Sequence, residues 1–393
     1  MTMGLISRDA REQRGAPQRG GGQSEEKIAP RAQKKKRIGK VKGKDLTMFC
    51  RQFATMIGAG VSLVRCLAVL EQQAGSASLK AVIREVQYSV ESGETLTRSL
   101  SQFPRIFNNL FTGLVRAGEV GGVLEDTLDR LAQFLEEDLK LKRKVKAAMT
   151  YPVIVMSAAI LIVIGLVTFI VPKFIELFKD FELTLPAPTI LLMNISHFMT
   201  NWVNDLILAG TLVILTIAIN RFKATKTGKL YYDKAMLKLP IIGKLNHMIA
   251  LARFSRTLAT LMASGVPILQ ALETVAGAID NEVISGALLD ARNAIREGER
   301  IAEPLARSKL FPPMVLQMIT IGEETGSLDA MLGKVADFYE AEVDAALESL
   351  TSAIEPLLIV FLGGVVGFIV VAMFLPLVKL IDGISSNGKG DSD

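Results

Sequence analysis

The chain has 393 residues and a formal net charge of +5, and half of its residues are hydrophobic although only 6% are aromatic. Such an apolar composition excludes an ordinary soluble protein and indicates a membrane protein with sizeable soluble parts. The cysteines, Cys50 and Cys66, and the two histidines follow no zinc or haem spacing. Both thiols are therefore expected to be buried or half-buried and reduced. The basic runs lack interleaved aromatic residues, so the composition does not favour binding of nucleic acid.

Residues 1–44 are rich in Gly, Gln, Arg and Lys and show almost no apolar periodicity. We predict a disordered basic tail there. It does not resemble a secretory signal, because no apolar stretch follows the charges. A second basic run, "KLKRKVK" at 140–146, directly precedes an apolar segment. Basic residues in that position mark the cytoplasmic side of a membrane.

Three apolar segments are candidates for membrane spans, at residues 148–173, 204–222 and 354–380. The first lies in a stretch of 26 uncharged residues and the third contains one of 23. About 20 apolar residues at 1.5 Å each cover the hydrocarbon core of a bilayer. The second segment is shorter, but Trp202 suits a membrane interface. We predict that all three are transmembrane helices.

The sequence repeats itself with an offset of 204 or 205 residues. "GEVGG" at 118–122 recurs as "GEETG" at 322–326, and "FCRQFATMIGAGVSLVRCL" from residue 49 aligns with "FSRTLATLMASGVPILQAL" from residue 254. Each copy shows helical periodicity without strand alternation. We therefore predict an all-α protein with two homologous helical-bundle domains, at residues 45–147 and 223–353, each followed by a span.

The distribution of charges predicts the topology. Basic residues flank the first two spans on the side of the repeats, whereas the loop at 174–203 carries few. The positive-inside rule then places both repeats and the N-terminus in the cytoplasm, and the loop and the tail at 381–393 in the periplasm.

No catalytic or cofactor-binding constellation emerges from the sequence. "GISSNGKG" at 383–390 resembles a phosphate-binding loop, but glycine stands where that motif needs a hydroxyl. Acidic clusters at 136–138 and 340–344 allow two interpretations, a site for a divalent cation or a solvated helix face. The chain is therefore expected not to be an enzyme, and no cofactor or metal ligand is assigned.

The repeated glycine–glutamate turns are the strongest candidate functional residues. Gly118 and Gly322 are expected to end one helix in a left-handed conformation, with Glu119 and Glu323 near the N-terminus of the next helix. The other pair of glycines, Gly122 and Gly326, is expected to allow close backbone approach. The alternative is that these turns contact a partner protein.

Three stretches resemble a known family: the repeated G-E-x-x-G-x-L turn, "TLATLMASGVPILQAL" at 257–272, and "ADFYEAEVD" with the final apolar segment. Over residues 48–382 the chain is similar to the inner-membrane platform proteins of type IV pilus and type II secretion machines, the PilC/GspF family. The ending favours the pilus branch. The first repeat has Ser62 where the second has Pro267, after the aligned glycines Gly60 and Gly265, and this departure puts equal function of the two domains in doubt.

The resemblance implies a non-enzymatic protein of pilus biogenesis or protein secretion. Such a protein is multi-pass in the bacterial inner membrane and forms a homodimer or a higher oligomer. Its implied partners are a cytoplasmic assembly or retraction ATPase, a pilin or pseudopilin, and other inner-membrane assembly proteins, with no nucleic acid. The alternative is a small permease or membrane sensor built on a duplicated domain. A role in motility, DNA uptake or export stays open.

Overall fold

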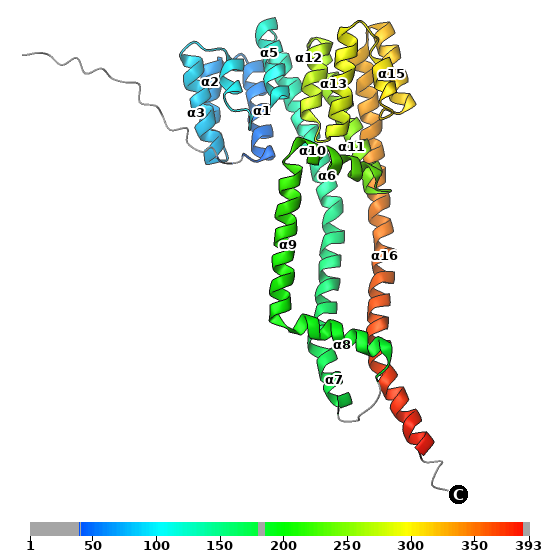
Figure 1. The fold of residues 1–393 in the computed structure, drawn as a ribbon. Coiled ribbons are helices and arrows are strands. Elements are labelled where there is room, and N and C mark those ends of the chain that lie inside the picture. Colours follow the sequence, from blue (N-terminus) through cyan, green and yellow to red (C-terminus); the bar gives the residue numbers. More distant parts are fainter. Residues whose placement is uncertain (1–38, 40, 180–184, 388–393) are drawn as a thin grey trace, which may run out of the picture. The chain divides into compact units, whose positions relative to one another are not determined.

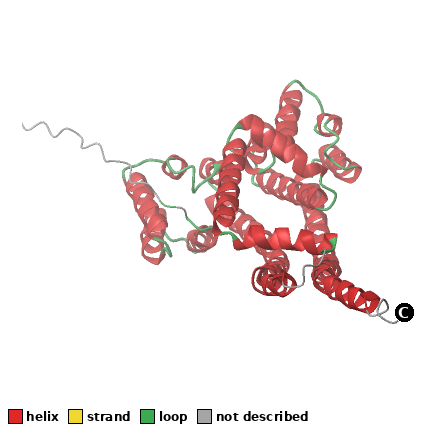
Figure 2. Ribbon diagram, turned by 60° about the horizontal axis from the view of Figure 1, so that its bottom comes forward, coloured by secondary structure: helices red, strands yellow, loops and turns green. Residues whose placement is uncertain are grey.

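The computed structural model describes residues 39, 41–179 and 185–387. Of the predicted tail at 1–44, residues 1–38 and 40 lie outside the described residues, and so do residues 388–393 of the predicted C-terminal tail. Within the described residues every regular element is a helix and there is no strand (Figure 2). The predicted all-α class is confirmed.

Six helices of the first repeat recur in the same order in the second (Figure 1). The first set is α1 (Gly43–Gly58), α2 (Leu63–Gln73), α3 (Ala77–Glu91), α4 (Leu96–Ser101), α5 (Asn109–Gly121) and α6 (Leu124–Gly165). The second set is α11 (Ile242–Ala263), α12 (Ile268–Ala278), α13 (Glu282–Arg296), α14 (Ala302–Arg307), α15 (Pro313–Thr325) and α16 (Leu328–Asn387). Equivalent pairs pack together: α1 and α5 lie against α6, as α11 and α15 lie against α16. The two predicted homologous bundles are confirmed.

Local sequence explains where the shorter helices begin and end. Ser76 and Asn281 cap α3 and α13 by accepting hydrogen bonds from backbone N–H groups of the first turn. Both helices end before a glycine with positive φ, Gly93 at 91° and Gly298 at 100°. Only glycine adopts that conformation without steric cost. These two glycines therefore turn the chain at the ends of α3 and α13.

Both repeats end in a helix that runs from the bundle into an apolar segment. α6 has 42 residues and continues through the π-helix η1 (Leu166–Ile170) into α7 (Val171–Lys179), and α16 has 60 residues. Among the described residues, three helices are long and apolar enough to cross a membrane: the helix that begins as α6, the helix α9 (Trp202–Lys223), and α16. Each contains one of the predicted spans. The bundle and the apolar segment of each repeat are thus parts of one continuous helix.

The segment predicted as a loop at 174–203 contains regular structure. α8 (Ala187–Thr200) fills its second half, and α10 (Lys226–Lys238) later leads from α9 into α11. Pro188 lies in the first turn of α8, where its missing N–H costs no helical hydrogen bond. The 14 residues of α8 are too few to suggest a span, so the sequence pattern indicated only a loop there. At the C-terminal end α16 reaches Asn387, so the first part of the tail expected at 381–393 is helical.

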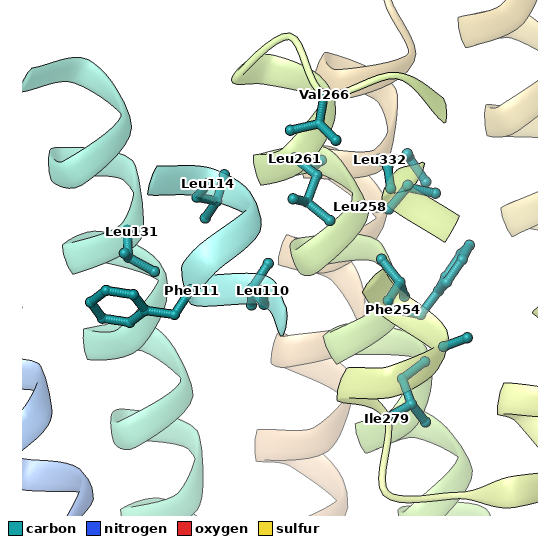
Figure 3. Packing of buried hydrophobic residues seen from close by; sticks show 14 of the residues in the cluster. Leu110, Phe111, Leu114, Leu131, Phe254, Leu258, Leu261, Val266, Ile279 and Leu332 are labelled. Atoms are coloured by element: carbon teal, nitrogen blue, oxygen red, sulfur yellow. The ribbon is translucent and has the colours of Figure 1, made fainter. Parts of the chain in front are cut away.

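One hydrophobic cluster draws its buried side chains from both repeats. Figure 3 shows Leu110, Leu114 and Leu131 from the first repeat and Leu258 and Leu332 from the second among its members. α5 contacts α12, and α6 contacts both α11 and α16, so the two bundles share an interface. Burial of apolar surface stabilises each bundle and the contact between them at the same time.

Two hydroxyl groups of α8 bind the long helices of both repeats. Ser196 Oγ donates to the Val167 carbonyl of η1 at 2.8 Å, and Thr189 Oγ1 donates to the Ala372 carbonyl of α16 at 2.6 Å. The two hydroxyl residues are seven positions, or two helical turns, apart. Leu192 lies between them and packs in a small buried cluster with side chains from both long helices. α8 therefore joins the two repeats at a second level, separate from the main core (Figure 1).

Prolines explain why these two carbonyls need a donor. Proline has no N–H, so Pro376 leaves the carbonyl four residues earlier, at Ala372, without its α-helical partner. In a π-helix the donor comes from five residues later, which for Val167 is Pro172. The two prolines are equivalent in the repeats, and α8 supplies one hydroxyl to each. A buried carbonyl without a donor would be costly.

We predict that Thr189→Val and Ser196→Ala each lower the free energy of unfolding by about 1–2 kcal/mol, because each leaves a buried carbonyl unpaired. Denaturant unfolding of the detergent-solubilised protein measures this change. Thr211→Val is the matched control, since that exposed hydroxyl bonds only within its own helix, to the Ile207 carbonyl. Losses no larger than in the control would show that α8 does not hold the long helices.

Candidate functional site

The two glycine–glutamate turns have the same geometry. Gly122 directly follows α5 and Gly326 directly follows α15, and both glycines adopt the left-handed conformation with φ of 69°. The next N–H group, of Val123 or Ser327, returns to the carbonyl of Gly118 or Gly322 at 2.9 Å. This pairing closes the helix C-terminus and turns the chain into α6 or α16.

The first glycine of each turn lies inside the helix and allows close approach of the next one. A Cβ atom on Gly118 would lie 3.0 Å from Leu124 Cα and 1.9 Å from Thr127 Oγ1. On Gly322 it would lie 2.8 Å from Leu328 Cα. The roles predicted for the glycines were therefore wrong: Gly122 and Gly326 adopt the left-handed conformation, and Gly118 and Gly322 allow the close approach.

The glutamates bind backbone amides of the preceding short helices. Glu119 accepts hydrogen bonds from the N–H groups of Leu96 at 2.7 Å and Thr97 at 3.0 Å, at the start of α4. Glu323 accepts from the Ile301 N–H, just before α14, at 3.1 and 3.3 Å. A carboxylate there satisfies unpaired amides and faces the positive end of the helix dipole. The prediction placed both glutamates at the following helix, which was wrong.

The turns at Gly60 and Gly265 form a second equivalent pair. Their φ angles are 76° and 75°, and each connects the first helix of a repeat to the second. In the first repeat this turn lies near the glycine–glutamate turn, because a Cβ on Gly58 would lie 3.1 Å from Glu125 Oε1 at the start of α6. The structure thus brings Gly60 and Gly122 to the same end of the bundle.

The serine–proline difference between the repeats leaves the backbone unchanged. Ser62 has φ −59° and ψ 144°, and Pro267 has φ −55° and ψ 139°. Ser62 makes no side-chain cap bond to α2. Its backbone already has the φ angle that proline requires. This departure therefore gives no structural reason for the two domains to act differently.

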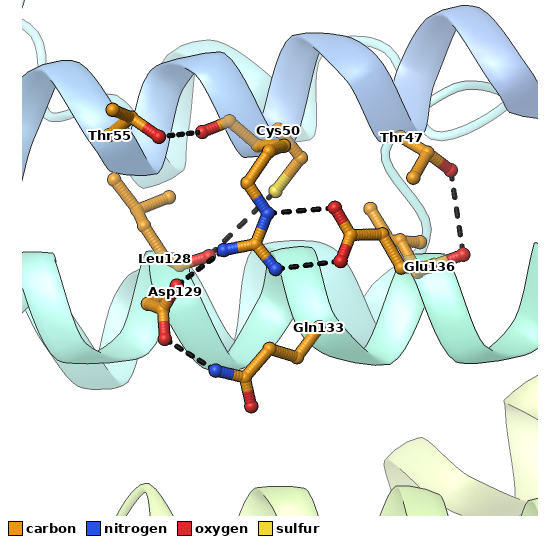
Figure 4. Close-up of polar contacts among 9 residues, drawn as sticks. Thr47, Cys50, Thr55, Leu128, Asp129, Gln133 and Glu136 are labelled. Carbon is orange, nitrogen blue, oxygen red and sulfur yellow. Dashed lines mark hydrogen bonds and ion pairs between the residues drawn. The ribbon is translucent and has the colours of Figure 1, made fainter.

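An arginine in the first helix of each repeat pairs with acids on the long helix, and this pairing was not among the features predicted from the sequence. Arg51 contacts Glu136 at 2.7 Å and Asp129 at 2.5 Å (Figure 4). Its equivalent, Arg256, contacts Glu340 at 2.9 Å and Asp337 at 2.7 Å. The sequence does carry a signal for this pairing, because Arg51 aligns with Arg256 and one acid of each set, Glu136 or Glu340, occupies the same position in both repeats.

Further ion pairs cross from one repeat to the other. Arg256 also contacts Glu137 of α6 at 3.1 Å, and Arg253 contacts Asp138 at 3.4 Å. Lys144 of α6 pairs with Asp344 of α16. Several carboxylates of the two acidic clusters are thus engaged by basic side chains. Among the described residues no group of three or more His, Cys, Asp or Glu side chains is arranged to hold a metal.

The surroundings of the arginines and thiols in this region shift their pKa values. Hydrogen bonding to Glu136 raises the pKa of Arg51 above its ordinary value. For Arg256, burial opposes the charge, but hydrogen bonds with Glu340 and Asp337 outweigh it and raise the pKa. Burial also raises the pKa of the Cys50 thiol. Cys50 and Cys66 are both free and buried, as predicted. The arrangement fixes helices against one another and holds its arginines charged.

We predict that Gly118→Ala lowers the free energy of unfolding by about 1–3 kcal/mol, because the added methyl group overlaps α6. The control is Gly286→Ala in α13, where a Cβ meets no atom within 4 Å and removal of glycine from a helix stabilises by up to about 1 kcal/mol. Chemical denaturation of both variants measures the difference. Equal effects at the two positions would contradict the close approach of α5 and α6.

We also predict that Ser62→Pro stabilises the protein by about 0.4–1 kcal/mol, since it reduces the entropy of the unfolded chain without native strain. The reciprocal change, Pro267→Ser, should destabilise by a similar amount. Thermal unfolding of the two variants tests the equivalence of the turns. Destabilisation by Ser62→Pro would show that the turns differ.

Comparison with known proteins agrees with the repeat architecture. The family model for type II secretion system (T2SS) protein F matches the chain twice, at residues 49–172 and 254–376. Each match covers one bundle and its first following apolar segment. The two matches coincide with the duplication found in the sequence and with the six-helix correspondence of the structure.

Relatives over most of the chain fall in two groups. The chain is 45% identical to a type IV pilus assembly protein PilC of Myxococcus xanthus, over 88% of this chain and 83% of the relative. It is 46% identical to a PilC of Thermus thermophilus, over 87% and 84%. Identity to a type II secretion system protein F of Vibrio cholerae is 34%, over 86% and 82%. These identities favour the pilus branch, and the chain belongs to the PilC/GspF family of membrane platform proteins of pilus and secretion machinery.

Proposed function

We propose that this protein is a multi-pass inner-membrane platform that couples a cytoplasmic hexameric ATPase to the insertion of pilin or pseudopilin subunits into a fibre. The observation that carries the proposal is the continuity of α6 and α16 from the bundles into the apolar segments. A force on either bundle is transmitted along an unbroken helix. The relatives named as pilus assembly proteins support the same role.

The proposed topology has both bundles and the N-terminus in the cytoplasm. Basic residues support it, because "KLKRKVK" at 140–146 precedes the first apolar stretch and α9 ends in Arg221 and Lys223. α9 then returns the chain to the cytoplasm so that the second repeat lies beside the first. In this arrangement α8 lies on the periplasmic side. Domain limits at 45–147 and 223–353 are part of the proposal.

The glycine–glutamate turns have a defined place in this proposal. Glu119 and Glu323 hold α4 and α14 at fixed positions on their bundles. We propose that these short helices and the adjoining turns form the surface that the ATPase or a second copy of the chain contacts. The glutamates then act by positioning that surface and do not themselves touch the partner.

We predict that the double variant Glu119→Gln, Glu323→Gln binds the assembly ATPase of the same organism more weakly. Loss of each charge-assisted contact costs about 1 kcal/mol of local stability and loosens the short helices. The measurement is co-elution of the detergent-solubilised protein with the ATPase, together with ATP turnover. The wild type is expected to bind and to change turnover.

The matched control is Glu85→Gln with Glu303→Gln, which removes one exposed carboxylate from each repeat without a described ion pair. The control is expected to bind like the wild type. Unchanged binding by the positioning double variant would refute the role of the glutamates. Absence of any binding or turnover change with a well-folded wild type would refute the coupling function itself.

A further inference from the structure

A cavity of about 490 Å³ lies between the start of α1 and the part of α6 that precedes its apolar stretch. Two helices that are about 90 residues apart in the chain supply its walls, so folding of the first repeat creates it. Its lining contains both basic and apolar side chains. The residues that line it are Lys44, Thr47, Met48, Arg51, Gln52, Glu136, Leu139, Lys140, Arg143 and Lys144.

Three of its basic side chains pair with no acid among the described residues. Arg51 is held by Glu136 and Asp129, and Lys144 pairs with Asp344. Lys44, Lys140 and Arg143 are exposed and lack such a partner in the described part of the chain. The lining holds five basic side chains and one carboxylate, that of Glu136, so the cavity has an excess of positive charge. That excess suits an anion such as a phosphate group.

The fold does not require this charge, because the second repeat lacks it. The positions equivalent to Lys44, Lys140 and Arg143 are occupied by Ile249, Asp344 and Leu347. α11 and α16 nevertheless pack as α1 and α6 do. The basic cavity is therefore a property of the first repeat alone, added to a scaffold that folds without it.

The cavity also offers apolar contacts to a ligand. Met48 and Leu139 line it, and the alkyl part of a lysine side chain can add apolar surface to such a site. An inorganic anion would use only the basic residues. A molecule with a phosphate head and an apolar body would use the basic and the apolar residues together, which favours an amphiphile.

The position along α6 fits a lipid at the membrane surface. The uncharged stretch begins at residue 147, seven residues after Lys140, which corresponds to about 10 Å along a helix. This step rests on the proposed topology, in which residues 140–146 meet the cytoplasmic leaflet. Lipid headgroups of that leaflet carry phosphate and negative charge. The cavity then lies at the depth of the headgroups.

We propose that this cavity binds the headgroup of an anionic phospholipid, with Lys44, Lys140 and Arg143 around the phosphate and Met48 and Leu139 against the start of an acyl chain. Lys44 belongs to α1 and the other two basic residues belong to α6, so the bound headgroup bridges the two helices. It thereby fixes the first bundle against the membrane surface, whereas the second bundle has no such contact.

The test uses the full chain in a mild detergent and native mass spectrometry, with phosphatidylglycerol, phosphatidylcholine or inorganic phosphate added in separate titrations. The variant is Lys44→Gln, Lys140→Gln, Arg143→Gln. The matched control is Arg65→Gln, Arg105→Gln, Arg116→Gln, which removes three exposed positive charges of the same repeat outside the cavity. Thermal unfolding of all three proteins verifies that they are folded.

We expect phosphatidylglycerol to bind the wild type and the control alike, and to bind the cavity variant at least about ten-fold more weakly. Phosphatidylcholine should bind weakly to all three. Equal phosphatidylglycerol binding by the cavity variant and the wild type would overturn the proposal. Inorganic phosphate binding as tightly as the lipid would also overturn it, in favour of a soluble anion. Neither result depends on the ATPase, so this experiment can refute the lipid site without refuting the coupling function.

Discussion

The close approach of the last short helix of each bundle to the long helix that follows it is the constraint on which the rest of the structure depends. Gly118 and Gly322 permit it, and Gly122 and Gly326 turn the chain so that it occurs. The long helix acquires its direction at that contact and keeps it through the apolar segment. Glu119 of α5 and Glu323 of α15 also bind the preceding short helices, α4 and α14. The long helix of each repeat therefore packs within its bundle and also continues out of it into the apolar segment.

The contacts between the repeats extend this constraint to the whole chain. Arg256 binds acids of its own repeat and Glu137 of the other, so one guanidinium joins both long helices. Because the Arg256 side chain is partly buried, solvent screens its ion pairs less than it screens pairs between fully exposed side chains. At the opposite end of the long helices, α8 joins the same two elements through Thr189 and Ser196. A platform that transmits force requires such connections at both ends, and this supports the proposed function.

Much of the architecture follows from the sequence, because duplication reveals itself as repeated apolar periodicity and as prolines at matched positions. The fold class, the two bundles and the apolar helices were predictable in this way. The roles of the glycines were not, because a sequence does not distinguish a glycine that needs positive φ from one that needs to lack a Cβ. The partners of Glu119 and Glu323 lie about 22 residues earlier in the chain, so only the tertiary fold identifies them. The hydroxyl bonds of α8 depend in the same way on where three distant helices meet.

We infer that the two repeats form one cooperative unit and not two independent bundles. Hydrogen exchange of the wild type and of Leu67→Ala tests it most directly. Leu67 is fully buried in α2, and its truncation costs about 2–5 kcal/mol, in a helix away from the interface with the second repeat. If the repeats unfold as one unit, exchange in the variant is faster in α11 to α15 as well as in α1 to α5, because both lose protection when the shared unit is destabilised. Faster exchange confined to the first repeat would contradict it.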